Sequence, residues 1–417
     1  MNQPISADSG WQPRYTVLVL MWSAYGCFYL NKLNLAPVIP LIIEDLGISH
    51  TRIGLISAAF FFFYATSQFL WGYLSDTLGP RKIVTFGGII SALANFIFSA
   101  GSGLFNLIGA QSLNGFGQGA GWGPSVKLLN NWFPGSESGR VLGVYATSVS
   151  IFTILAYWLA GFIGEHLGWR AAFQVSPVIL LIVLLIYWLA VRDYPGKPGL
   201  RKVESGSAKT HKNFSQIQNR FSAAISNKDF WLASGAFACL TYISYANMVW
   251  LPTYLYESHG LDVVKAGFLA SLYPAIGILT RPLGGYLSDV HFGGRRKPLI
   301  LTGFFFILLS TFFLVSATHL GLAMALIICV GFFDQLIVIL FFALVLDILP
   351  KESTGTGAST MNALGHAGST GAMFFSGLLI DKFHSYKPVF LVLSILAGMG
   401  ILTMLFIKER KVNHSFF

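Results

Sequence analysis

Two copies of one pentapeptide decide the fold of this chain. GYLSD stands at residues 72–76, within GYLSDTLGPRK (72–82), and again at 285–289, ahead of GGRRK (293–297). Each copy ends an apolar stretch and precedes a basic cluster, and the two copies are 213 positions apart. A second pair of similar segments has nearly the same spacing: Pro40 in LNLAPVIPLIIEDLGI (33–48) aligns with Pro252 in ANMVWLPTYLYESHGL (246–261). The chain is therefore predicted to contain two similar halves.

The composition indicates a membrane protein. Of 417 residues, 54% are hydrophobic and only 11% are charged, whereas soluble domains carry about 25% charged residues. This excludes an ordinary cytosolic enzyme, a disordered protein and a coiled coil. The three cysteines all lie in apolar stretches and are interpreted as small core residues without metal-ligand spacing.

Twelve apolar segments are long enough to cross a bilayer, which takes about 20 residues. They are 15–42, 53–75, 83–102, 105–133, 139–163, 169–191, 231–256, 264–288, 298–317, 320–347, 355–380 and 386–407. The polar stretch 192–229, with PGKPG at 195–199, is predicted to link the halves. The expected fold is an all-α membrane protein with twelve transmembrane helices in two six-helix halves, 1–191 and 230–417, related by a pseudo-twofold axis.

The basic residues predict the orientation. Nineteen Lys and Arg fall on the side of the termini and the linker, against five in the opposite loops. By the positive-inside rule both termini are predicted to be cytoplasmic. The net charge of +10 is thus a topology signal, and the lipid bilayer rather than nucleic acid is the expected partner. Short external loops without Asn-x-Ser/Thr indicate a bacterial inner membrane, and a monomer is expected.

GYLSDTLGPRK resembles the loop motif of the major facilitator superfamily, G-x-L-(S/A)-D-R-x-G-R-(R/K). The resemblance implies that the motif aspartate caps the following helix and pairs with loop arginines at the cytoplasmic face. Gating roles follow for Asp76 and Arg81, and in the second copy for Asp289 and Arg295. Thr77 and Pro80 replace residues that are usually basic in the family.

Further motifs resemble one branch of that superfamily, the organophosphate:phosphate antiporters and anion:cation symporters. They are YLNKLNLAPVIP (29–40), GFGQGAGWGPSVKLLNNWFP (115–134), GRVLGVY (139–145), WLPTYL (250–255) and LPKESTGTGASTMNALGHAG (349–368). This branch implies a small anionic substrate, bound at mid-membrane between the halves.

Few charges fall inside the predicted spans: Lys32, Lys127, Arg281 and Asp334. Such residues normally face a cavity or a partner. Lys32 aligns with the substrate-binding arginine of the glycerol-phosphate antiporters. Tyr25 and Tyr29 lie on roughly the same helix face. An anion site needs such a cation with hydroxyl donors, although Lys32 could instead pair with Asp334.

The other candidate binding residues come from both halves. Arg281 corresponds to Gln68 under the repeat, and Tyr64 precedes Gln68 by four residues. Arg281 is expected to bind the anion or to reach the interface as a snorkelling side chain. Trp122 and Tyr245 are further candidates for the cavity wall, with packing as the alternative for Trp122.

Lys127 lies close to the end of its span, so it is either a gate residue or a ligand contact.

Asp334 and His366 are the candidate proton-coupling residues, because both can titrate at mid-depth. Asp334 could instead be a static partner of Lys32 or Arg281. Two departures from the glycerol-phosphate antiporters are Ser244, where they have a second arginine, and Val149, where they have a histidine. These departures leave the substrate open.

Together these features predict a secondary active transporter that moves a sugar acid, carboxylate or organophosphate by alternating access. Proton symport is the first expectation for coupling, and anion exchange is the second. The rivals are a multidrug or siderophore exporter and a transporter-like membrane sensor. The sequence contains no phosphate-binding loop, no metal cluster and no placed nucleophile–base pair, so neither enzymatic activity nor a cofactor is expected.

Overall fold

The computed structural model describes residues 12–133, 137–195, 226–350 and 353–408, and every regular element in these ranges is a helix. The helices are α1 (Pro13–Leu33), α2 (Leu35–Leu46), α3 (His50–Leu78), α4 (Pro80–Ala100), α5 (Leu104–Gln118), α6 (Trp122–Trp132), α7 (Ser138–Leu167), α8 (Trp169–Ala190), α10 (Lys228–His259), α11 (Val263–Ala275), α12 (Gly277–Val290), α13 (Lys297–Leu314), α14 (Leu320–Ile348), α15 (Thr354–Phe383) and α16 (Lys387–Phe406). Most of the predicted linker, 196–225, lies outside the described residues.

Eleven stretches of the described chain are long and apolar enough to cross a bilayer, which confirms an all-α membrane protein. Two of them each join two helices, α1 with α2 and α11 with α12. The predicted span 105–133 is instead a broken pair, α5 and α6. The break contains Gly119 and Gly121, and glycine is a weak helix former. A Cβ atom on Gly121 would lie 2.9 Å from the ring of Tyr25, so this close approach needs glycine.

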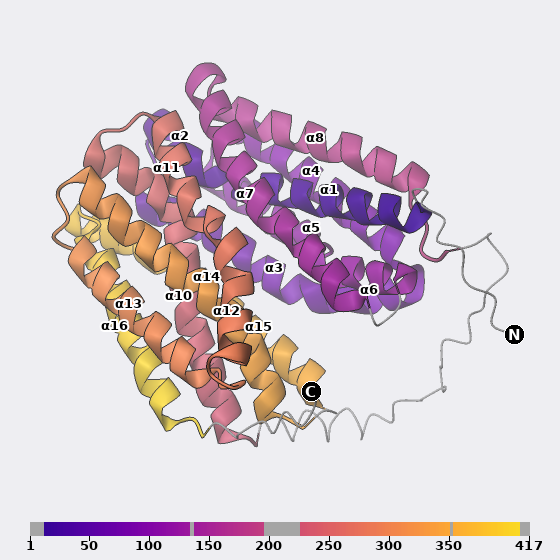
Figure 1. Cartoon of the computed structure of the whole chain (residues 1–417). Coiled ribbons are helices and arrows are strands. Elements are labelled where there is room, and N and C mark those ends of the chain that lie inside the picture. Colours follow the sequence, from indigo (N-terminus) through magenta and orange to yellow (C-terminus); the bar gives the residue numbers. More distant parts are fainter. Residues whose placement is uncertain (1–11, 134–136, 196–225, 351–352, 409–417) are drawn as a thin grey trace, which may run out of the picture.

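The helices form two bundles, α1 to α8 and α10 to α16, drawn from indigo to magenta and from salmon to yellow in Figure 1. The bundles meet along α3 with α15, α7 with α11, and α2 with α10. The remaining packing lies mostly within each bundle. The interface between the halves therefore runs past α3 and α10, which carry Tyr64 and Tyr245, and past α2, which directly follows the end of α1 that carries Lys32.

The first GYLSD copy lies in the last turns of α3, and a tight turn at Gly79 then joins α3 to α4. Gly79 ends α3 with a φ of +89°, a conformation that glycine adopts without strain. Pro80 then begins α4, where its missing N–H costs nothing. This turn brings Asp76 and Arg81 to one end of the first half.

Candidate anion-binding site

Lys32 lies in the last turn of α1, and only 7% of the residue is exposed. Five aromatic rings surround its ammonium nitrogen, with ring centres 4.2 to 6.0 Å away: Tyr29, Phe60, Phe61, Tyr64 and Tyr245. We call this group the Lys32 cage. The ammonium donates a 3.4 Å hydrogen bond to the Tyr245 hydroxyl, and within the described ranges no carboxylate pairs with it. A buried cation without a paired anion costs free energy, so this position favours the binding of an anion.

Amide side chains next to Lys32 hold α1 in place. Asn31 donates to the backbone oxygens of Cys27 and Ser176, at 3.0 and 3.2 Å. The amides of Asn114 and Asn95 donate to the backbone oxygen of Asn31, at 2.9 and 3.5 Å. These bonds tie α1 to α4, α5 and α8, and so set the rotation that turns Lys32 toward the second half.

His366 lies beside the Lys32 cage, on α15. Its ring is perpendicular to that of Tyr64, with centres 4.9 Å apart, and its centre is 6.4 Å from that of Tyr245. The residue is 8% exposed, and its buried Nδ1 has no hydrogen-bond partner in the part of the chain that the structure describes. The structure thus brings Lys32 and His366 to the same two tyrosine rings, from opposite halves.

Asp334 belongs to a second cluster, within the C-terminal half. Its Oδ1 accepts a 2.5 Å hydrogen bond from Ser244, and its Oδ2 accepts a 2.7 Å bond from the Gln335 amide. Gln335 Oε1 in turn accepts two bonds from Arg281, at 3.0 and 2.6 Å. Asp334 therefore reaches Arg281 through Gln335 and forms no direct ion pair with Lys32 among the described residues.

The remaining predicted binding residues lie on the α1 side of the site. Tyr25 packs against Tyr29, Trp122 and Tyr145, with ring centres 5.5, 5.6 and 5.1 Å away. Trp122 is 39% exposed, so it extends this aromatic wall outward from Tyr25. Gln68 donates to the backbone oxygen of Tyr64 on its own helix and makes no described contact with Lys32.

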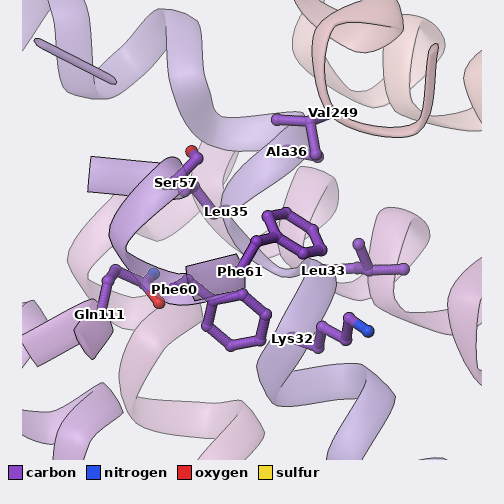
Figure 2. Close-up of a pocket in the computed structure, with 9 residues that line it drawn as sticks. All are labelled: Lys32, Leu33, Leu35, Ala36, Ser57, Phe60, Phe61, Gln111 and Val249. Carbon is purple, nitrogen blue, oxygen red and sulfur yellow. The ribbon is translucent and has the colours of Figure 1, made fainter. Parts of the chain in front are cut away.

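A small cavity adjoins the Lys32 cage. Its lining residues are Lys32, Leu33, Leu35, Ala36, Ser57, Phe60, Phe61, Gln111 and Val249. Figure 2 shows the rings of Phe60 and Phe61 beside the Lys32 side chain. The space open to the centre of a water molecule is about 10 Å³, close to the minimum that holds one water. The side chains and halves must therefore separate before an organic anion can reach Lys32.

At the end that carries the first GYLSD copy, Asp76 forms a 2.7 Å ion pair with Lys127, which also donates to the backbone oxygen of Ser75. The expectation that Asp76 caps the next helix is wrong. The carboxylate that caps α4 belongs to Asp193, whose Oδ1 accepts the Arg81 backbone N–H at 2.7 Å. Asp76 thus pairs with Lys127 on α6 and not with Arg81 among the described residues, and Thr77 and Pro80 stand where the family usually has basic residues.

In the second copy the motif aspartate does pair with a loop arginine, as the resemblance implies, although the arginine is the neighbour of the predicted gating residue Arg295. Asp289 pairs with Arg296, and Arg296 also lies 3.6 Å from Asp347. Arg295, the predicted partner, is exposed, and its backbone oxygen accepts from Ser288. Arg296 directly precedes α13, and this position turns its side chain, rather than that of Arg295, toward α12 and α14.

Several residues of the site were not identified from the sequence. Phe60 and Phe61 looked like ordinary apolar residues of a span. Asn31 and Gln335 were overlooked, although each directly adjoins a charged residue that was identified. An amide at bilayer depth needs internal partners, and that rule could have found both.

The fold and the buried charges between two helical bundles define a membrane transport protein of the alternating-access type. Comparison with known proteins agrees. The family model described as Major Facilitator Superfamily matches residues 21–373 and 294–417. The chain therefore belongs to this superfamily, and the expected fold is confirmed.

Named relatives are similar over nearly the whole chain. A probable hexose phosphate transport protein of Chlamydia pneumoniae is 27% identical, covering 94% of this chain and 90% of the relative. The glycerol-3-phosphate transporter of Bacillus subtilis is 28% identical, covering 96% and 94%. A solved bacterial homologue of the human lysosomal transporter Spinster shares the fold, with a TM-score of 0.76 at 17% identity over 95% of both chains. The chain is thus a multi-pass membrane protein and not an enzyme.

Proposed function

We propose that the chain is a secondary active transporter of a small organic anion, with Lys32 as the cation that binds it. The observation that carries this proposal is the state of Lys32. It is buried at the interface of the halves, held by aromatic rings and one tyrosine hydroxyl, and paired with no described carboxylate. A substrate carboxylate, sulfonate or phosphate would supply the missing charge. The relatives named as organophosphate transporters support an anionic substrate.

Alternating access would move the halves 1–191 and 230–417 as two bodies around this site. Tyr245 and His366 come from the second half and Lys32 from the first, so a bound anion would draw the halves together. Asp76 with Lys127, and Asp289 with Arg296, would brace the predicted cytoplasmic end within each half. Both termini would then lie in the cytoplasm of a bacterial cell.

Proton coupling is proposed for Asp334 and His366. Asp334 is fully buried and accepts bonds from Ser244 and Gln335 without a direct cation partner among the described residues. Protonation of Asp334 would weaken its bond from the Gln335 amide, which would let Gln335 turn away from Arg281 and so free Arg281 for the anion. The unpartnered Nδ1 of His366 could relay the proton or donate to the substrate.

The proposal is tested first by ligand binding to the purified protein and then by uptake of the bound ligand. Purified protein is screened for thermal stabilisation by glycerol 3-phosphate, glucose 6-phosphate, glucuronate, sulfoacetate, inorganic phosphate and lipophilic cations, because a ligand stabilises the state that it binds. The variant Lys32→Ala is compared with Lys82→Ala, which removes an exposed lysine. Loss of one charge-assisted bond costs about 2 kcal/mol, or roughly 30-fold in affinity.

The expected result is stabilisation by an anion that Lys32→Ala loses and Lys82→Ala keeps. Uptake of that anion into proteoliposomes, with and without an inward proton gradient, then tests transport and coupling. Stabilisation by lipophilic cations alone, unchanged in Lys32→Ala, would replace this proposal with a drug exporter. Anion binding without uptake would favour a membrane sensor.

A further inference from the structure

The two halves touch at one end of the molecule through a contact that occurs twice. On α15, Asp381 lies in the last turn, and its two oxygens accept the backbone N–H groups of His50 and Thr51, at 3.0 and 2.7 Å. His50 and Thr51 are the first residues of α3, in the other half. On α7, Glu165 lies in the last turn, and its Oε2 accepts the backbone N–H of Val263 at 2.9 Å. Val263 is the first residue of α11, again in the other half.

The two contacts correspond under the internal repeat. His50 and Val263 are 213 positions apart, the same spacing as the two GYLSD copies. Each follows a residue that caps its own helix, Ser49 in α3 and Asp262 in α11. The first N–H groups of both helices therefore remain available to a carboxylate from the opposite half, and the positive end of a helix favours that charge.

Glycines let the helices approach at both contacts. Four residues before each carboxylate stands a glycine, Gly377 or Gly161, and it faces the backbone oxygen of the first residue of the partner helix. Four residues into each partner helix stands another, Gly54 or Gly267. A Cβ atom on Gly54 would lie 2.5 Å from the oxygen of Met373, and one on Gly267 would lie 3.2 Å from the oxygen of Tyr157.

One of the two contacts also holds a titratable side chain. His50 Nδ1 lies 2.9 Å from Asp381 Oδ1, and Nε2 lies 2.9 Å from Glu257 Oε1 on α10. Both ring nitrogens face carboxylate oxygens, which only accept, so both must carry a proton. The other groups against this ring are Trp250, and Tyr386 through its bond to Glu257. The matching residue in the second contact is Val263, which cannot titrate.

We propose that these two carboxylate-to-helix contacts form the gate at this end of the protein, and that His50 makes one of them a proton-binding site. With the predicted topology this end faces the cell exterior. Opening toward that side must break both contacts, and a proton on His50 favours closure. External protons would therefore bias the transporter toward the state closed to the outside. The inference rests on the alternating-access part of the proposed function and is independent of the substrate.

The test measures access to the central cavity from outside the cell. Ser57 is buried and lines the cavity, two turns along α3 from His50. Ser57→Cys is labelled in intact cells with a membrane-impermeant maleimide, and the background from the three native cysteines is subtracted. Ser102→Cys, in the exposed turn between α4 and α5, reports that this end faces the reagent and corrects for the pH dependence of the thiol reaction.

The gate is tested first by removing each carboxylate. Asp381→Ala and Glu165→Ala are each expected to speed labelling of Ser57→Cys by about tenfold, and the double variant by more, since each loses a charged hydrogen bond. Asp262→Ala is the matched control, because Asp262 caps α11 from its own half. Hydrogen bonds from Lys265 hold the pKa of Asp262 below its ordinary value, so it too is charged. Unchanged labelling in both variants, or equal labelling in Asp262→Ala, overturns the gate.

The proton site is tested by the pH dependence. Raising the external pH from about 6 to about 8, the range over which histidine titrates, is expected to speed the corrected labelling of Ser57→Cys. His50→Gln is expected to remove this dependence. The same pH dependence in His50→Gln overturns the proton site and leaves the gate standing. Anion stabilisation of the purified protein is measured in parallel, so that failure of the gate is distinguished from failure of the transport proposal.

Discussion

Replacing Lys32 with methionine is expected to make the protein more stable and unable to bind its substrate. Lysine at mid-membrane depth costs about 2.5–3.5 kcal/mol on the insertion scale. Against this cost stand the surrounding rings, the nearest centre at 4.2 Å, and one long hydrogen bond of 3.4 Å. Cation–π contact and that bond together return about 2 kcal/mol. Methionine fills a similar volume without a charge, so Lys32→Met is expected to gain about 1 kcal/mol.

The assay is the apparent Tm of the purified protein, with and without the anion found in the screen. A gain of about 1 kcal/mol corresponds to a rise of about 1–3 °C. The anion adds about 2.7 kcal/mol to the parent at 100 times its Kd, and this shift is expected to vanish in Lys32→Met.

The matched control is Lys127→Met, which breaks the 2.7 Å ion pair with Asp76 at the surface. Exposed pairs contribute about 0–1 kcal/mol, so the apparent Tm is expected to stay or fall slightly, and the anion shift to remain. A fall in the Tm of Lys32→Met as large as that of the control, or an anion shift that persists in it, refutes the unpaired-cation reasoning. Such a result would mean that Lys32 stabilises the folded protein and does not bind the substrate.

Three further outcomes are expected. Gly115→Ala places a methyl group against a backbone oxygen of α3 and is expected to cost about 1–3 kcal/mol, seen as a lower Tm and yield, whereas Gly143→Ala meets nothing within 4 Å and is expected to be neutral. Asp193→Asn is expected to lower the Tm by weakening the cap of α4 by about 1 kcal/mol, while Asp76→Asn leaves that helix end unchanged; equal effects would contradict the cap assignment. Asp334→Asn is expected to retain anion binding and to lose the acceleration of uptake by an inward proton gradient; acceleration that survives would exclude Asp334 as the proton carrier.

The fold could be predicted from the sequence because membrane proteins satisfy their backbone hydrogen bonds locally. Each span must be a helix in lipid, and the repeated GYLSD then shows which spans of the two halves correspond. The span 105–133 shows where this reasoning stops. Its hydropathy predicts one helix, but a break at 119–121 divides it, and hydropathy does not show that Gly121 in this break packs against the ring of Tyr25.

The site was predicted in part, and charge explains which part. Lys32, Arg281 and Asp334 stood out because a charge in a span is rare and conspicuous. Phe60 and Phe61 are ordinary in a span, so only packing shows that they surround an ammonium group. The pairings also needed the structure. Arg295 and Arg296 are neighbours in the chain, and only the path of α13 decides which one reaches Asp289.

The sequence alone determined that the elements are membrane-spanning helices, that they repeat in two halves, and which few charges lie within spans, because hydropathy and charge can be read within a single span. Tertiary structure decided which of these groups meet. Lys32 faces rings rather than Asp334, Asp193 rather than Asp76 caps α4, and Asp381 and Glu165 close two matching contacts between the halves. The cap of α4 and the two contacts between the halves join residues 98 to 331 positions apart, and the Lys32 cage draws its rings from three helices. All of these contacts depend on how far each helix is rotated and how closely it approaches its neighbour. The local sequence pattern predicts neither the rotation of a helix nor its distance from its neighbour.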